Sequence, residues 1–392
     1  MLYRHGYTIR CESLRSHSHP VDYVTHRKKY LYGIAHTFQK LLGSLAPSLA
    51  MFPRLYDWLR ERVLRSNRQA AIDAGAGSQW LSAAFREPRS TASRILRQRE
   101  LAYRLYLPAG IGKADRLPLL VMLHGCRQSA VEFAAGTRMN AEAERHFCAV
   151  LYPEQTTRFN SQRCWNWFEP ESLIGQGEAG LIVHTVRHVM DLYPLDAARV
   201  YVAGLSAGGA MAAVLSATHD DLFAACAIHS GVMFRAATTA LEAIQVMRRG
   251  SGEPVSRPPK GTLHQQLPRS RLVPTLIIHG SSDPTVNPVN AKQLAEQVRS
   301  LAEHLYSGDT ALTLRDEQQL ESGGRHYRQQ DMTFGQTVLL RSILVDGLGH
   351  AWSGGDAHHN FFDSAGPDAS RLIVEFLLSH RLPVVRGAGS AT

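Results

Sequence analysis

The chain has 392 residues, of which 44% are hydrophobic and 20% are charged. A chain of this size can bury the core of one or two domains, and no run reaches the roughly 18 consecutive apolar residues that a membrane helix requires. The formal net charge of +9 belongs to the first 100 residues, because the remainder holds almost equal numbers of basic and acidic residues. The near-neutral remainder suits a neutral substrate, and we expect no nucleic-acid partner.

Residues 1–95 form a basic N-terminal extension with two parts. Residues 1–30 are polar and aperiodic, so we expect them to be disordered. Within 31–65, apolar residues recur at helical spacing, which predicts amphipathic helices. These helices either dock on a neighbouring domain or associate weakly with an anionic surface, and the sequence leaves both open. Polar residues interrupt the apolar stretch that follows the basic residues 27–29, so there is no convincing signal peptide.

Residues 96–385 alternate strand-like and helix-like runs, which predicts a mostly parallel central sheet with helices on both faces, an α/β fold. The predicted strands are 101–107, 117–124, 147–152, 199–205, 222–228, 272–279 and 336–345, and the predicted helices are 180–192, 291–305 and 369–378. Residues 235–271 depart from this pattern, because they are rich in glycine, proline and basic residues. They form either a lid or substrate wall near the site, or a plain surface excursion with an internal helix at 239–248.

The predicted strand 199–205 leads into a Gly-Leu-Ser-Ala-Gly pentapeptide centred on Ser206. A pentapeptide of this kind between a strand and a helix makes a sharp turn that presents the serine hydroxyl. Only small residues fit at Gly204 and Gly208, where the two backbones nearly touch. A chance match is the alternative, but the strand before the pentapeptide and the small-residue helix after it favour a nucleophile at Ser206.

A serine nucleophile needs a histidine base and an orienting carboxylate, which follow it along the chain in this kind of hydrolase. Asp283 follows an apolar strand and is the predicted acid, although an aspartate there can also simply cap a turn. His350 lies on a glycine-rich loop after the last predicted strand and is the predicted base. The pair His358 and His359 has no further ligands at metal spacing, so we expect neither a metal nor another cofactor.

Acyl transfer also needs two backbone N–H groups that bind the oxyanion. One comes from the residue after the nucleophile, which is Ala207 here. The other comes from the loop after an earlier strand. The run 117–124 is that strand, and the N–H of Cys126 in the following loop is the predicted second donor.

Seven motifs follow one another between residues 95 and 382. They are LHGCRQ at 123–128, YPEQ at 152–155, CWNWF at 164–168, GLSAGG at 204–209, HGSSDPTV at 279–286, GHAWSGG at 349–355 and GPDAS at 366–370. With these motifs the chain resembles the polyhydroxybutyrate depolymerase family of esterases, which also holds feruloyl and acetylxylan esterases. The resemblance implies an α/β-hydrolase fold, a Ser206–Asp283–His350 triad and oxyanion donors at Cys126 and Ala207. It also implies an extracellular location, with the cytoplasm as the alternative.

The five cysteines are Cys11, Cys126, Cys148, Cys164 and Cys226, and none has metal-ligand spacing. Cys148 and Cys226 lie in apolar strands and are expected in the core. A disulfide between Cys126 and Cys164 would brace the oxyanion loop, but it needs an oxidising compartment. In a reducing cytosol the two would be thiols without an essential role.

Four aromatic residues, Trp165, Trp167, Phe168 and Trp352, lie in the two loops that flank the predicted site. If exposed, they would form an apolar platform for an acyl chain, a polyester repeat or an aryl ring, whereas core packing is the competing interpretation of each. Family members that digest crystalline polyester carry a further surface-binding domain after the catalytic one. Only about a dozen residues follow the last predicted helix, so we expect soluble oligomers or small esters as substrates.

The predicted function is hydrolysis of carboxylic esters by a serine nucleophile, with short hydroxyalkanoate oligomers or related small esters as substrates. Feruloyl or acetylxylan ester hydrolysis is the alternative within the family. A non-catalytic binding protein on a hydrolase fold is the alternative of another class, and the intact triad and oxyanion loop argue against it. The sequence does not predict the oligomeric state.

Overall fold

The computed structural model describes residues 77–87, 99–112, 114–252 and 271–383. The chain divides into two units, Met1–Leu59 and Arg60–Thr392, and all described residues belong to the second. The predicted disordered segment and amphipathic helices of the N-terminal extension therefore lie outside the described residues.

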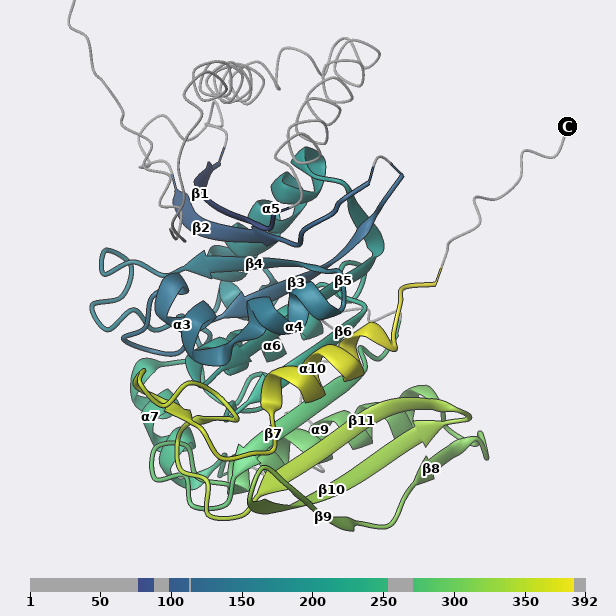
Figure 1. The fold of residues 1–392 in the computed structure, drawn as a ribbon. Coiled ribbons are helices and arrows are strands. Elements are labelled where there is room, and N and C mark those ends of the chain that lie inside the picture. The colour runs from purple at the N-terminus through teal and green to yellow at the C-terminus, as the bar shows by residue number, and fades with distance from the viewer. Residues whose placement is uncertain (1–76, 88–98, 113, 253–270, 384–392) are drawn as a thin grey trace, which may run out of the picture. The chain divides into compact units, whose positions relative to one another are not determined.

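An eleven-stranded sheet is the framework of the described part (Figure 1). Its strands are β1 (Gln79–Arg86), β2 (Glu100–Leu107), β3 (Leu117–Leu123), β4 (Ala149–Glu154), β5 (Leu195–Leu205), β6 (Ala225–His229), β7 (Thr275–Gly280), β8 (Leu312–Leu314), β9 (Gln318–Ser322), β10 (Arg325–Phe334) and β11 (Thr337–Val345). Their order across the sheet is β1-β2-β4-β3-β5-β6-β7-β11-β10-β8, with β9 also paired to β10. The pairs from β4 to β11 are parallel and the outer pairs are antiparallel, as the predicted α/β architecture requires.

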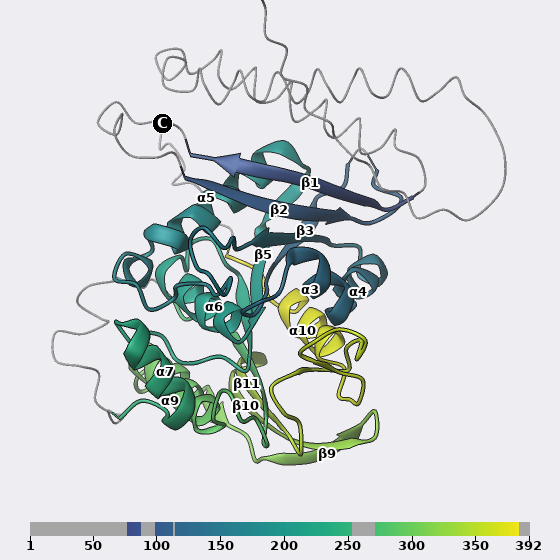
Figure 2. The ribbon, with the colours of Figure 1, turned by 90° about the vertical axis from the view of Figure 1, so that its left-hand side faces the viewer.

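Helices cover both faces of this sheet (Figure 2). They are α3 (Ala130–Thr137), α4 (Met139–Arg145), a 3-10 turn at Ser172–Ile174, α5 (Gly177–Leu192), α6 (Ala207–Thr218), α7 (Ala240–Arg249), α9 (Val289–Leu305) and α10 (Ala369–Leu378). Helices α5, α6, α7 and α9 contribute to one hydrophobic cluster, and α3, α4 and α10 contribute to the other. A small second sheet pairs β12 (Trp352–Ser353) with β13 (Phe362–Asp363).

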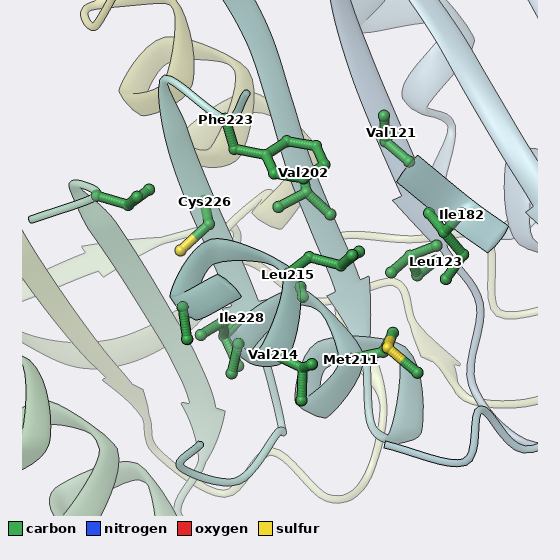
Figure 3. Packing of buried hydrophobic residues seen from close by; sticks show 14 of the residues in the cluster. Val121, Leu123, Ile182, Val202, Met211, Val214, Leu215, Phe223, Cys226 and Ile228 are labelled. Atoms are coloured by element: carbon green, nitrogen blue, oxygen red, sulfur yellow. The ribbon is translucent and has the colours of Figure 1, made fainter. Parts of the chain in front are cut away.

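The central strands are apolar along their whole length because helices bury both of their faces. Every residue of β3 is buried. Its Val121 and Leu123 belong to the cluster on the side of α5 and α6, whereas Leu120 and Met122 belong to the opposite cluster. Figure 3 shows part of the first cluster, with side chains of β3, β5 and β6 packed around α6. This packing fixes the carboxyl ends of the parallel strands, where the candidate site lies.

The sheet begins earlier in the chain than the predicted domain boundary at residue 96. Strand β1 pairs antiparallel with β2 along its whole length, from Gln79 opposite Leu107 to Arg86 opposite Glu100. Alternate residues of β1 are partly buried, and Phe85 packs against the core. The exposed Trp80 and the small Ala83 on the partly buried side weaken the period-two pattern that would have indicated this strand.

The segment 235–271 is described only in part. Helix α7 lies within it, and the Thr239 hydroxyl at its start accepts a hydrogen bond from the N–H of Glu242, which matches the predicted internal helix. Residues 253–270 lie outside the described ranges, so the lid interpretation stays a prediction. None of the helices that the structure describes is long and apolar enough to span a membrane.

Candidate active site

Ser206 occupies the turn between β5 and α6, with φ 58° and ψ −121°. A non-glycine residue at positive φ is rare, and such strain is concentrated at functional sites. Added Cβ atoms at Gly204 and Gly208 would lie 2.3 Å from the Gly208 carbonyl oxygen and 2.1 Å from the Leu123 carbonyl oxygen. Gly204 is therefore needed where β5 meets α6, as the sequence predicted, whereas Gly208 is needed where α6 meets the end of β3. The turn leaves Ser206 9% exposed at the carboxyl edge of the sheet.

Asp283 and His350 are joined by a hydrogen bond of 2.7 Å between Asp283 Oδ2 and His350 Nδ1. The other oxygen, Oδ1, accepts the N–H groups of Thr285 and Val286, each at 2.8 Å. Burial alone would raise the pKa of Asp283, but the hydrogen bond and charge of His350 and the Val286 N–H outweigh it, so this pKa lies below its ordinary value. The carboxylate is therefore ionised and can orient the imidazole.

The sheet brings the three predicted residues to the same edge. Ser206 follows β5, Asp283 follows β7 and His350 follows β11, and these strands run parallel across β6. The end of β6 links them further, because the His229 carbonyl accepts the N–H of Ser206 at 2.9 Å. The His229 ring stacks on Trp352, two residues beyond His350, with ring centres 5.1 Å apart. Strand order thus places nucleophile, base and acid candidates together.

The loop after β3 lies beside the serine. An added Cβ at Gly125 would lie 3.6 Å from the Ser206 Cβ. In this loop the Gln128 side chain accepts the N–H of Gly125 at 2.8 Å. The N–H groups of Cys126 and Ala207 have no hydrogen-bond acceptor within the described part of the chain. Two free N–H groups beside a serine are the arrangement that an oxyanion needs.

Buried neighbours hold the loop after β3 in place. A disulfide joins Cys126 to Cys164. The indole N–H of Trp165 donates to the His124 carbonyl at 3.1 Å. The His124 ring donates from Nδ1 to the Gly125 carbonyl at 2.7 Å and accepts the Gln155 N–H at Nε2. Burial lowers the pKa of His124, so the neutral tautomer that this pattern requires is the stable one.

Three of the four predicted substrate-contact aromatics are core residues, which corrects the platform interpretation. Trp165, Trp167 and Trp352 are 1%, 4% and 0% exposed. Trp352 also donates its indole N–H to the Ser370 hydroxyl at 3.1 Å. The large apolar area of these rings is buried behind the loops that they support, so they position loops instead of presenting a surface. Phe168 is half-buried and is the member of this set that stays a candidate for substrate contact.

Sequence reasoning missed two residues at the site, Arg127 and Phe361. The Arg127 guanidinium lies over the Phe361 ring, 5.5 Å from its centre, and that ring meets the His350 ring edge-to-face at 6.3 Å. Arg127 stands inside the motif at 123–128, which was the available signal, whereas nothing near Phe361 in the sequence marks it. No group of three or more His, Cys, Asp or Glu residues suitable for a metal occurs among the residues that the structure describes.

The site geometry agrees with similarities to known proteins. The family model described as esterase PHB depolymerase matches residues 101–317, more than half of the chain. The chain is 33% identical over 254 residues to poly(3-hydroxyalkanoate) depolymerase C of Paucimonas lemoignei, which is 62% of this chain and 57% of that protein. It is 30% identical over 247 residues to a feruloyl esterase B of Thermothelomyces thermophilus, which is 59% of this chain and 78% of that protein.

A solved structure shares the same fold. The acetyl xylan esterase from Aspergillus awamori aligns with a TM-score of 0.54 at 19% identity, covering 69% of this chain and 94% of that one. Similarity at this level of identity shows the common α/β-hydrolase fold and nothing about the substrate. The chain spans little more than half the length of the depolymerase that it matches.

Proposed function

The chain belongs to the esterase PHB depolymerase family, and on that premise we propose that it is a serine-dependent carboxylic ester hydrolase. The observation that carries the proposal is the Asp283–His350 hydrogen bond at the sheet edge that also holds the strained turn of Ser206. A carboxylate fixed on an imidazole beside such a serine has the residue types and order of an acyl-transfer triad.

In the proposed mechanism the Ser206 hydroxyl attacks the ester carbonyl while His350 Nε2 takes its proton. Asp283 accepts the Nδ1–H of His350, which fixes the tautomer and stabilises the imidazolium. The N–H groups of Cys126 and Ala207 bind the oxyanion of the tetrahedral intermediate. His350 then protonates the leaving alcohol, and water activated by the same histidine hydrolyses the acyl-enzyme.

The proposed substrates are short hydroxyalkanoate oligomers or related small esters. The resemblance to a poly(3-hydroxyalkanoate) depolymerase supports the acyl chemistry. The burial of Trp165, Trp167 and Trp352 removes most of the predicted platform for an acyl chain, a polyester repeat or an aryl ring, so the aromatic residues do not choose between these substrates. The Cys126–Cys164 disulfide supports an oxidising, extracellular compartment within this proposal.

Replacing the nucleophile tests the proposal. We expect Ser206→Ala to lower kcat on a short nitrophenyl ester by about 10⁶ while the unfolding curve stays close to that of the wild type, because removing a triad serine eliminates the covalent route. Wild-type protein should also be labelled once by an organophosphate serine probe, and the variant should not be labelled. Undiminished hydrolysis by Ser206→Ala would end the assignment of this site.

A panel of esters then separates the substrate classes. We expect kcat/KM to be highest for hydroxybutyrate oligomers and lower for methyl ferulate and acetylated xylan. The reverse order would assign the protein to the feruloyl or acetylxylan branch and leave the serine mechanism intact.

A further inference from the structure

Arg127 is held beside the candidate catalytic histidine. It follows the oxyanion residue Cys126 directly, and its guanidinium lies 5.5 Å from the centre of the Phe361 ring. The same ring also meets the His350 ring edge-to-face, with the ring centres 6.3 Å apart. The aromatic ring therefore stands between a permanent positive charge and the triad, and an arginine over an aromatic face is a favourable pairing.

Both partners of this contact have unusual backbone conformations. Arg127 has φ 64° and Phe361 has φ 72°. Such φ values are unfavourable for a residue with a side chain and persist only where surrounding contacts impose them. Here the Arg127 N–H donates to the Gln162 carbonyl at 2.7 Å, and the Phe361 carbonyl accepts the N–H of Trp352 at 2.9 Å. These hydrogen bonds hold the backbone of both residues in their positive-φ conformations.

The charge of Arg127 has no counter-ion in the described part of the molecule. The side chain is exposed, and no carboxylate lies within 4 Å of its guanidinium among the residues that the structure describes. Arg127 differs in this from arginines such as Arg325, which pairs with Asp363 at 3.1 Å, and Arg341, which pairs with Asp331. A guanidinium that is positioned but unpaired offers the planar set of donors that binds a carboxylate through two hydrogen bonds.

We propose that the Arg127 guanidinium, positioned by Phe361, binds a carboxylate carried by the ester substrate. The inference rests on the proposed function and names its substrate class: esters of hydroxy acids that keep a free carboxylate near the scissile bond. An oligomer of a hydroxy acid carries such a group at its acid end. The near-neutral charge of residues 101–392 is compatible with this proposal. The substrate carboxylate is recognised by the single charge of Arg127 and not by the electrostatic field of the whole chain.

Matched substrates test the inference. One pair is the dimer of 3-hydroxybutyrate and the same dimer with its free acid converted to an amide, so that only a carboxylate on the alcohol portion differs. A second pair is the nitrophenyl monoester of glutaric acid and its amide, which moves the carboxylate to the acyl portion. We expect wild-type kcat/KM to be about tenfold higher for the acid member of at least one pair.

Arg127→Asn removes the charge with little backbone risk, because asparagine tolerates positive φ better than most residues. The measured quantity is the acid-to-amide ratio of kcat/KM, in which any effect on the shared chemistry cancels. We expect this ratio to fall to about one in Arg127→Asn. The matched control is Arg116→Gln, which removes one exposed charge at the opposite end of β3 and should keep the wild-type ratio.

Salt provides a readout that needs no variant. Raising the ionic strength from about 0.01 M to 1 M shortens the screening length from about 30 Å to 3 Å, so the wild-type ratio should fall towards one. Three results would each overturn the inference while leaving ester hydrolysis intact. The acid-to-amide ratio of the wild type could be near one on both pairs, Arg127→Asn could retain the wild-type ratio, or salt could leave the ratio unchanged. If wild-type protein hydrolyses neither member of either pair nor any neutral nitrophenyl ester, the proposed function fails first.

Discussion

Three buried histidines lie at the carboxyl edge of the sheet without being proposed to react. His124 follows β3, His229 ends β6 and His279 lies near the end of β7, and all three are 0% exposed. Nε2–H of His279 donates to the Val286 carbonyl at 2.8 Å and lies 3.5 Å from Asp283 Oδ2. Burial lowers the pKa of each ring, so each is neutral at pH 7 and supports the loops as a hydrogen-bonding group without charge.

These histidines predict a loss of stability in acid. Burial, and then the charges of His279 and His350, lower the pKa of His229 to about 3. Above pH 6.5 neither the folded nor the unfolded state carries this proton, so the group contributes nothing. Between about pH 6.5 and pH 3 the unfolded state binds a proton that the folded state does not, and the free energy of unfolding falls as the pH falls. For His229 alone the loss at pH 5 relative to pH 8 is about 2 kcal/mol.

Urea unfolding at the two pH values measures this effect. His229→Phe cannot bind the proton and keeps a ring against Trp352, so its stability should fall by about 2 kcal/mol less than that of the wild type between pH 8 and pH 5. His124, His279 and Asp283 contribute equally to both curves. An identical pH dependence of the two proteins would show that folding does not lower the pKa of His229.

At the scale of elements, the loop after β3, which we propose to bind the oxyanion, is tied to the loop at 155–166. The disulfide joins them covalently. Glu178, in the first turn of α5, accepts the backbone N–H of Asn166 at 2.7 Å and the side-chain amide of Gln155 at 2.7 Å. Burial raises the pKa of Glu178 although these hydrogen bonds oppose it. The proposed donor N–H of Cys126 is therefore positioned by contacts that extend to the first turn of α5.

Breaking the disulfide should affect stability and activity together. The bridge closes a loop with a sequence separation of 38, and removing a bridge of this kind lowers the free energy of unfolding by an amount on the order of 2–4 kcal/mol. We expect a phosphine reductant to lower both the unfolding midpoint and kcat. Cys148 and Cys226 are buried and lie outside the bridge, so a double alanine variant of those two is the control for reductant effects elsewhere. Peptide mass spectrometry that finds Cys126 and Cys164 as free thiols in protein made under oxidising conditions would contradict the bridge.

The elements that the sequence predicted are those with one dominant signal. Central strands such as β3 and β7 are continuous apolar runs, and α10 has the predicted bounds Ala369–Leu378. Strand β9 was missed because it is almost wholly exposed and polar, so no periodicity marks it. Helix α3 was missed because it has eight residues, although its capping box of Ser129 and Glu132 was a readable start signal.

The candidate site likewise contains residues that the sequence predicted and contacts that it did not. Ser206, Asp283 and His350 each follow a recognisable strand, so their convergence is a consequence of parallel topology. The Arg127–Phe361 contact joins residues far apart in the chain through a loop that has no regular pattern. The burial of Trp165 and Trp352 likewise depends on which loops cover them, and this is decided only when the whole sheet is packed.

Across the whole molecule, the excess of basic residues and the candidate catalytic residues lie in different parts of the sequence. Residues 1–100 hold 17 basic and 7 acidic residues, whereas the rest of the chain is close to neutral. Every candidate catalytic residue lies beyond residue 120, and the described sheet begins at Gln79. The basic extension is therefore not needed to supply a reacting group, and we keep association with an anionic surface as a prediction for it.

Deleting residues 1–30 tests this separation. We expect kcat and KM on a soluble nitrophenyl ester to stay within a factor of a few of the wild-type values. The removed segment is polar and aperiodic, and it ends well before the first described strand, which begins at Gln79. If the segment instead serves an anionic surface, full-length protein should bind acidic lipid vesicles more tightly than the truncated protein, and salt should abolish the difference. Ser206→Ala in the full-length chain is the control for vesicle binding, since it should bind as the wild type does. A loss of several orders of magnitude in kcat/KM on deletion would show that the extension helps to build the active site, because no electrostatic effect of distant surface charges on a neutral ester reaches that size.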